Sequence, residues 1–103
     1  MAAPCPDEVK YAVADRVRDR FVEMQRRGEK PAGHAIANLV TVNGIRAVTD
    51  DGTWGLVRAS SNKPEMVVVV ESPVSETRMR EMFRVVDGVL RESGPVGAYN
   101  QTI

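Results

Sequence analysis

The chain has 103 residues, of which 43% are hydrophobic and 27% are charged, with 14 basic and 14 acidic side chains. These values predict one soluble globular domain over residues 1–103 and exclude a disordered chain. Because the net charge is zero and only 5% of the residues are aromatic, we expect no nucleic-acid partner. No apolar run approaches the roughly 20 residues that cross a bilayer, and the first residues lack a signal peptide's features. We therefore expect a cytoplasmic protein without a membrane partner.

The first predicted element is an amphipathic helix that starts at Pro6-Asp7, with Asp7 as its N-cap. Apolar residues recur in it at helical spacing, while charged residues fill most other positions. These apolar positions are Val9, Val13, Val17, Phe21 and Met24. Arg26-Arg27-Gly28 predicts the end of the helix, because cations complement the helix dipole and glycine adopts the left-handed conformation. The residues before Pro6 are too few to predict a complete element.

Four strands are predicted next, over Ile36–Val42, Ile45–Thr49, Trp54–Ala59 and Glu65–Glu71. The first two are joined by Asn43-Gly44, which is the strongest short hairpin signal. The last strand contains four consecutive valines, a pattern that predicts a central strand buried on both faces.

A second amphipathic helix follows, with Ser75 as its N-cap and Gly94-Pro95 at its end. Its apolar stripe consists of Met79, Met82, Phe83, Val86, Val89 and Leu90. The order of elements predicts an α+β two-layer sandwich, in which an antiparallel four-stranded sheet carries two helices on one face. Residues 94–103 show no periodicity, and we expect them to form a flexible tail.

Catalytic and metal-binding patterns are hard to find in this sequence. His34 is the only histidine, and no cysteine or carboxylate cluster lies beside it in a way that would orient it, so a solvent-facing loop histidine is the expected interpretation. Asp50-Asp51-Gly52 resembles part of a calcium loop but lacks the later ligands, and it is interpreted as a turn. We therefore predict no catalytic residue, no metal ligand and no cofactor in this domain.

The loop from Arg58 to Lys63 is the best candidate binding site. It places an arginine, two serines, an asparagine and a lysine within six residues, without a carboxylate. Side-chain and backbone donors in a tight turn suit an anion with several oxygens, such as phosphate. The predicted phosphate-binding residues are Arg58, Ser60, Ser61, Asn62 and Lys63. The alternative is a hairpin connection whose polar residues only face water.

The residues around this loop resemble a known family. Residues 54–64, WGLVRASSNKP, follow the pattern of a strand and an Arg-x-Ser-(Asn/Gly/Ser)-(Thr/Asn)-x-Pro loop. That pattern is typical of the C-terminal (fourth) domain of the α-D-phosphohexomutases, the phosphomannomutase/phosphoglucomutase family. Asn43-Gly44-Ile45-Arg46 is similar to that family's Asp-Gly-(Val/Ile)-Arg turn. The resemblance extends over nearly the whole chain and implies a fold like that of the TATA-box-binding protein.

By this resemblance, Arg58, Ser60, Ser61 and Asn62 hold the positions that contact substrate phosphate. Lys63 falls at a variable position and is included for its charge alone. The resemblance implies a parent enzyme that moves a phosphoryl group between the 1- and 6-positions of a hexose through a phosphoserine and a bisphosphorylated sugar. The expected partners are hexose 1-phosphate, 6-phosphate and 1,6-bisphosphate, and other domains of that enzyme. The catalytic serine and the Mg²⁺ would belong to those other domains, so this domain would bind phosphate without catalysis.

Two other classes of protein stay open from the sequence alone. One is a free-standing α+β regulatory module that binds a small ligand. The other is a nucleic-acid-binding or protein-interaction domain, which the zero net charge and the few aromatic residues disfavour.

Overall fold

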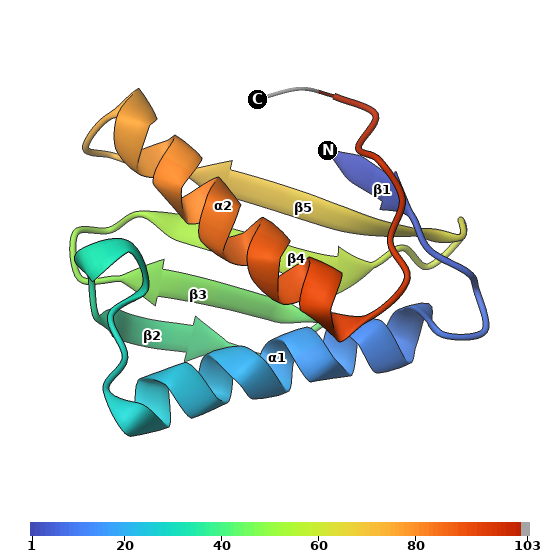
Figure 1. Cartoon of the computed structure of the whole chain (residues 1–103), viewed down its shortest axis with the longest axis horizontal. Coiled ribbons are helices and arrows are strands. Elements are labelled where there is room, and N and C mark those ends of the chain that lie inside the picture. Colours follow the sequence, from blue (N-terminus) through green and yellow to red (C-terminus); the bar gives the residue numbers. More distant parts are fainter. Residues whose placement is uncertain (102–103) are drawn as a thin grey trace.

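A computed structural model describes residues 1–101 as two helices packed on one face of a single sheet (Figure 1). All neighbouring strands pair antiparallel, in the order β1-β5-β4-β3-β2. The elements are β1 Ala2–Pro4, α1 Lys10–Arg27, the short 3₁₀ turn η1 Pro31–Gly33, β2 Ile36–Val40, β3 Ile45–Thr49, β4 Trp54–Ala59, β5 Glu65–Glu71 and α2 Glu76–Ser93. The predicted α+β class with two helices and an antiparallel sheet is confirmed.

The sheet has five strands, so the prediction of four is wrong. The additional strand β1 pairs Ala2 with Val67 and Pro4 with Glu65, and the amino terminus donates to the Val68 carbonyl at 2.9 Å. Pairing needs only backbone groups, and three residues are too short to show an alternating side-chain pattern. The composition of this segment therefore did not reveal the strand.

Helix α1 starts at Lys10, and the prediction of Asp7 as its N-cap is wrong. Val9 holds the cap position without a side-chain hydrogen bond, while the Asp7 carboxylate lies 2.8 Å from the Lys10 ammonium. At the other end Gly28 has φ of 69° and its N–H donates to the Gln25 carbonyl, as predicted for a glycine stop.

Three of the four predicted strands have the observed bounds, whereas β2 ends at Val40 and not at Val42. Asn43 and Gly44 have φ of 56° and 100°, the left-handed conformations that this turn requires.

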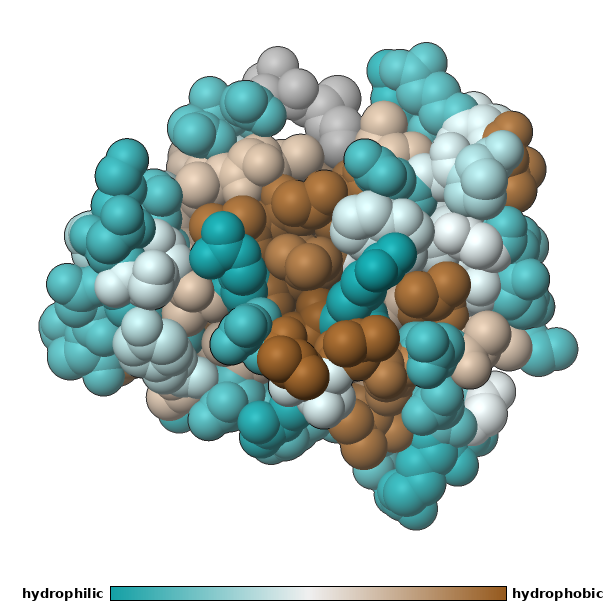
Figure 2. All heavy atoms as spheres, turned by 180° about the vertical axis from the view of Figure 1, so that it is seen from behind, coloured by the Kyte–Doolittle hydropathy of each residue, from teal (hydrophilic) through white to brown (hydrophobic). Residues whose placement is uncertain are grey.

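Strand β5 is an internal strand, as predicted, but it is not buried on both faces. Val68 and Val70 are buried beneath the helices, while Val67 and Val69 on the other face are partly exposed. Figure 2 shows that rear face as an apolar area crossed by hydrophilic side chains. The run of valines therefore indicates an internal strand here, but it does not indicate a second layer that covers the rear face of the sheet.

Helix α2 begins as predicted, because the Ser75 hydroxyl accepts a hydrogen bond of 3.0 Å from the Arg78 N–H. Both helices place their apolar stripes against the sheet and against each other. The buried core consists mainly of Val13, Val17, Phe21, Ile45, Ala47, Val57, Met66, Val68, Met82, Val86 and Leu90. Over residues 1–101, neither helix is apolar enough along its length to cross a bilayer.

The segment after α2 contacts the rest of the domain over the described residues. The Tyr99 ring packs edge-on against Phe83, with 5.3 Å between centroids, and its hydroxyl donates to Asp87 at 2.8 Å. The Asn100 N–H donates to the Ala2 carbonyl. The flexibility expected for residues 94–103 stays a prediction, and its last two positions, 102 and 103, lie outside the described residues.

Candidate functional site

The Arg58–Lys63 loop lies at the end of the sheet where β4 turns into β5. The turn between β2 and β3 comes to the same end, beside helix α1 (Figure 1). These three segments enclose an open hollow of about 480 Å³. The hollow is lined by Tyr11, Ala14, Asp15, Arg18, Thr41, Asn43, Gly44, Arg58, Ala59 and Ser61.

Two of the five predicted phosphate-binding residues, Arg58 and Ser61, line the hollow. Arg58 belongs to strand β4, so its backbone is fixed by pairing with Val67. Ser61 is exposed in the loop. An arginine on a paired strand beside an exposed hydroxyl provides charged and neutral donors at one end of the hollow.

Ser60, Asn62 and Lys63 are not among the residues that line the hollow. Ser60 is buried, and its hydroxyl donates to the Asn62 side-chain oxygen at 3.1 Å while its N–H donates to the Glu65 carbonyl. This bonding braces the loop internally. Asn62 and Lys63 are exposed on the outside of the loop.

Lys10 is a residue that the sequence analysis missed. It is only 5% exposed, and its ammonium donates to the Lys63 carbonyl at 3.0 Å as well as pairing with Asp7. The first turn of α1 therefore holds one end of the Arg58–Lys63 loop and places a cation beside it. A signal was present, because Lys10 continues the apolar stripe of Val13 and Val17 at helical spacing.

Gly44 lets the turn between β2 and β3 approach strand β4 closely beside the hollow. A Cβ at this position would lie 2.2 Å from the Val57 carbonyl oxygen and 2.9 Å from the Arg58 Cα. No side chain fits there, so the backbone of the β2–β3 turn packs directly against the strand that carries Arg58.

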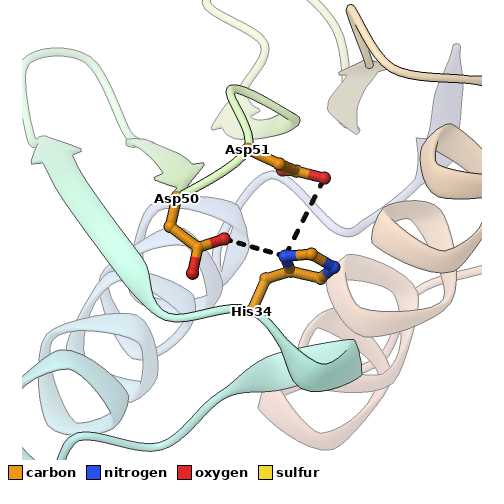
Figure 3. A group of neighbouring side chains, drawn as sticks. All are labelled: His34, Asp50 and Asp51. Carbon is orange, nitrogen blue, oxygen red and sulfur yellow. Dashed lines mark hydrogen bonds and ion pairs between the residues drawn. The ribbon is translucent and has the colours of Figure 1, made fainter.

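The other end of β4 carries a second polar cluster, formed by His34, Asp50 and Asp51 (Figure 3). The His34 Nδ1 atom lies 2.8 Å from the Asp50 carboxylate and 3.9 Å from that of Asp51. The expectation of a histidine without a carboxylate beside it is therefore wrong. The turn after β3 folds back over the connection that precedes β2, a contact that sequence spacing alone does not reveal.

The His34–Asp51 cluster is nevertheless a poor metal site. The Arg78 guanidinium donates to Asp51 at 2.6 Å and holds the pKa of that carboxyl well below its usual range. Thr49 and Thr53 also donate to Asp51. An arginine that occupies a carboxylate excludes a cation from it, because both compete for the same oxygens. Asp50-Asp51-Gly52 forms a turn, as predicted.

An antiparallel sheet covered on one face by two helices, with a polar hollow where a loop meets the first helix, defines this chain as a small α+β two-layer domain. A family model described as "Phosphoglucomutase/phosphomannomutase, C-terminal domain" matches residues 3–89. The chain therefore belongs to this family.

Individual relatives agree with that assignment. A "Phosphopentomutase" from Thermococcus kodakarensis is 33% identical over 81 residues, which are 79% of this chain and 16% of the relative. A "Probable phosphoglucosamine mutase" from Methanothermobacter thermautotrophicus is 32% identical, over 71% of this chain and 14% of the relative. A "Phosphomannomutase/phosphoglucomutase" from Pseudomonas putida is 32% identical, over 76% and 15%. The chain thus spans about one sixth or less of the length of these phosphomutases.

Proposed function

We propose that this chain is the part of a cytoplasmic phosphohexomutase that binds the phosphate group of the substrate. The Arg58–Lys63 loop supplies the donors, with Arg58 and Ser61 facing the ligand and Ser60 bracing the loop from within. The observation that carries the proposal is the hollow that these donors share with the β2–β3 turn and helix α1. A hollow of about 480 Å³ lies within the usual range for small-molecule sites.

The chemistry of a mutase explains why a loop of generic donors is suitable. In the proposed parent enzyme, a phosphoserine donates its phosphate to a hexose phosphate, and the bisphosphorylated sugar turns around before it returns the other phosphate. The loop must then hold a phosphate on either end of the sugar. Arginine and hydroxyl donors recognise phosphate itself, so they tolerate both orientations.

We propose that the phosphoserine and the Mg²⁺ belong to other domains of the parent enzyme. Mg²⁺ would neutralise charge on the transferring phosphoryl group. The His34–Asp51 cluster does not suit that ion, because Arg78 and two threonines already bond to Asp51. This domain then contributes binding and orientation, which are large terms in phosphoryl transfer.

The test is a titration of the chain with inorganic phosphate, followed by the shifts of its backbone amide signals. We expect the shifts to concentrate on residues 58–63 with a Kd on the order of millimolar, because one phosphate makes only a few contacts. Arg58→Ala should weaken binding about tenfold or more, the effect of losing hydrogen bonds from a charged donor.

Arg84→Ala is the matched control, because Arg84 is an exposed arginine of α2 outside the hollow. It removes the same charge and should leave the affinity unchanged. If the shifts avoid residues 58–63, or if both variants bind phosphate as the unmodified chain does, the proposed function is wrong.

A further inference from the structure

We propose that the free edge of strand β2 pairs with the same strand of a second copy of this chain, so that two copies form one continuous sheet around a twofold axis. The inference goes beyond phosphate binding and does not depend on it. It concerns the margin of the sheet where β2 lies, beside helix α1, at the lower side of the domain in Figure 1.

The first observation is that the opposite margin, formed by β1, is closed by the segment after α2. The Gly97 N–H donates to the Pro4 carbonyl at 2.8 Å, and the Asn100 N–H donates to the Ala2 carbonyl at 2.9 Å. The Ala2 N–H donates to the side-chain oxygen of Asn100 at 2.9 Å, and Pro4 has no N–H. A further strand therefore finds no free backbone groups on Ala2 or Pro4.

The β2 margin is open. Over residues 1–101, no backbone hydrogen bond joins Ile36–Val40 to a segment other than β3. An antiparallel strand bonds to one neighbour through alternate residues, so the remaining N–H and C=O groups of β2 point away from the sheet. Three of its five residues, Ala37, Asn38 and Val40, are exposed. Such an edge is a template for another strand.

This open edge also lacks the residues that protect edge strands. Residues 35–44 contain no charge and no proline, the two devices that most directly prevent pairing with another chain. Exposed apolar side chains gather here as well. Among residues 1–101, four of the five exposed large hydrophobic side chains belong to α1, β2 or the turn after β2, namely Tyr11, Val22, Val40 and Val42. A partner at this margin would cover apolar surface as well as backbone groups.

A second copy fits the edge because an antiparallel strand is its own complement. A twofold axis perpendicular to the sheet brings β2 against β2 in opposite directions and keeps the helices of both copies on one face. The uncharged strand adds no repulsion between the copies. Since the β1 margin is closed, assembly through β2 stops at two copies.

The charges of α1 suit the same axis, which makes the two α1 helices run in opposite directions. They form one ion-paired group of net negative charge in the first ten residues of the helix and one of net positive charge near its end. These groups are Asp15, Arg18 and Asp19, and Glu23, Arg26 and Arg27. In the dimer, the negative group of each helix faces the part of the other helix that carries the positive group, so the potentials are complementary.

The affinity should be low. A register shift between Ile36 and Asn38 interrupts the strand, so its regular part is Asn38–Val40. A seam of this length, even with contacts between the helices, is smaller than the interface of about 1,200 Å² or more that stable complexes bury. We expect a Kd on the order of 0.1 mM.

The experiment is sedimentation equilibrium of the chain from about tenfold below to about tenfold above that Kd. We expect a monomer–dimer equilibrium without larger assemblies. The backbone amide signals of residues 38–42 should move with concentration, while those of β1 should not. Val40→Lys places a charge at the seam in each copy, and we expect it to raise the Kd about tenfold or more.

Val74→Lys is the matched control, because Val74 is also an exposed valine, at 57% against 39% for Val40, but lies between β5 and α2. It adds the same charge and should leave the Kd unchanged. A chain that stays monomeric throughout would overturn the proposal, as would a Val40→Lys variant that dimerises like the unmodified chain. Concentration-dependent shifts confined to the rear face of the sheet (Figure 2) would also overturn it, because they would place the contact elsewhere.

Discussion

The two ends of strand β4 both carry clusters of polar residues, yet they differ in how those residues are bonded. At the start of β4, Asp51 accepts hydrogen bonds from Arg78, Thr49 and Thr53. At its end, Arg58 and Ser61 line an open hollow. The comparison separates polar groups that stabilise the fold from polar groups that are available to a ligand. Residue type alone does not separate them, because both ends contain an arginine and hydroxyl side chains.

The largest expected effect on stability comes from a substitution at the start of β4, where Asp51 is hydrogen-bonded to Arg78. Arg78→Met removes a guanidinium that is 9% exposed and leaves the Asp51 carboxylate, 16% exposed, without its cation. We expect the free energy of unfolding to fall by about 3 kcal/mol, the usual consequence of removing one partner of a buried pair. Urea denaturation measures this change.

Arg80→Met is the control for that substitution, since Arg80 pairs with Glu76 at the surface. Its effect should be below about 1 kcal/mol. Phosphate affinity should be the same in both variants. A similar loss of stability in the two variants would show that the hydrogen bonds to Asp51 do not stabilise the fold more than a surface ion pair does.

A smaller loss of stability is expected from adding a side chain at Gly44, beside the hollow at the end of β4. Gly44→Ala puts a Cβ against the Val57 carbonyl at a position with φ of 100°. Strain of this kind is typically about 1–3 kcal/mol, so stability should fall by that amount and the Arg58 amide signal should move. Gly88→Ala is the control, because no atom lies within 4 Å of the new Cβ and the residue is helical. That variant should gain about 0.5–1 kcal/mol. Equal effects at both glycines would show that the turn does not pack against β4 as described.

The smallest effect is a change in the dependence of stability on pH. The Arg78 hydrogen bond lowers the pKa of Asp51 in the folded chain. The unfolded chain, whose Asp51 pKa is about 3.9, then binds more protons below roughly pH 5. The stabilisation by ionised Asp51 is thus complete above that pH and is lost as the pH falls. Asp51→Asn should flatten the acid limb of a stability–pH curve by at most about 1.4 kcal/mol per pH unit. An unchanged slope would mean that Asp51 is not held by Arg78.

Much of the fold could be predicted from the sequence because most of its elements carry a periodic pattern. Local side chains predict helix α2 with its Ser75 cap, strands β3, β4 and β5, and the Gly28 stop. Strand β1 could not be predicted, since its pairing with β5 depends on backbone groups distant in the chain. The same limit applies to the proposed site. The loop itself could be predicted from the sequence, but the residues that surround it could not.

The surroundings of that loop were not visible. Lys10 and Asp15 come from a helix whose charged residues look alike in the sequence, and only the fold brings these two to the loop or the hollow. The contact of Arg78 with Asp51 likewise joins residues 27 positions apart. Long-range contacts between charged side chains leave no periodic signal, so sequence patterns cannot assign them.

The short strand β1 has a consequence for how this domain behaves among copies of itself. Strand β5 contains Met66 followed by four valines, a segment with high β-propensity and no charge. At the margin of a sheet, such a segment would be a template for pairing with another chain. Strand β1 pairs with the first part of this edge, Glu65–Val67, and Met1 bonds to Val68 next to it. The strand ends in Pro4, which has no N–H to offer a further strand. By pairing with this edge of β5, the first residues of the chain reduce its tendency to pair with another chain and aggregate.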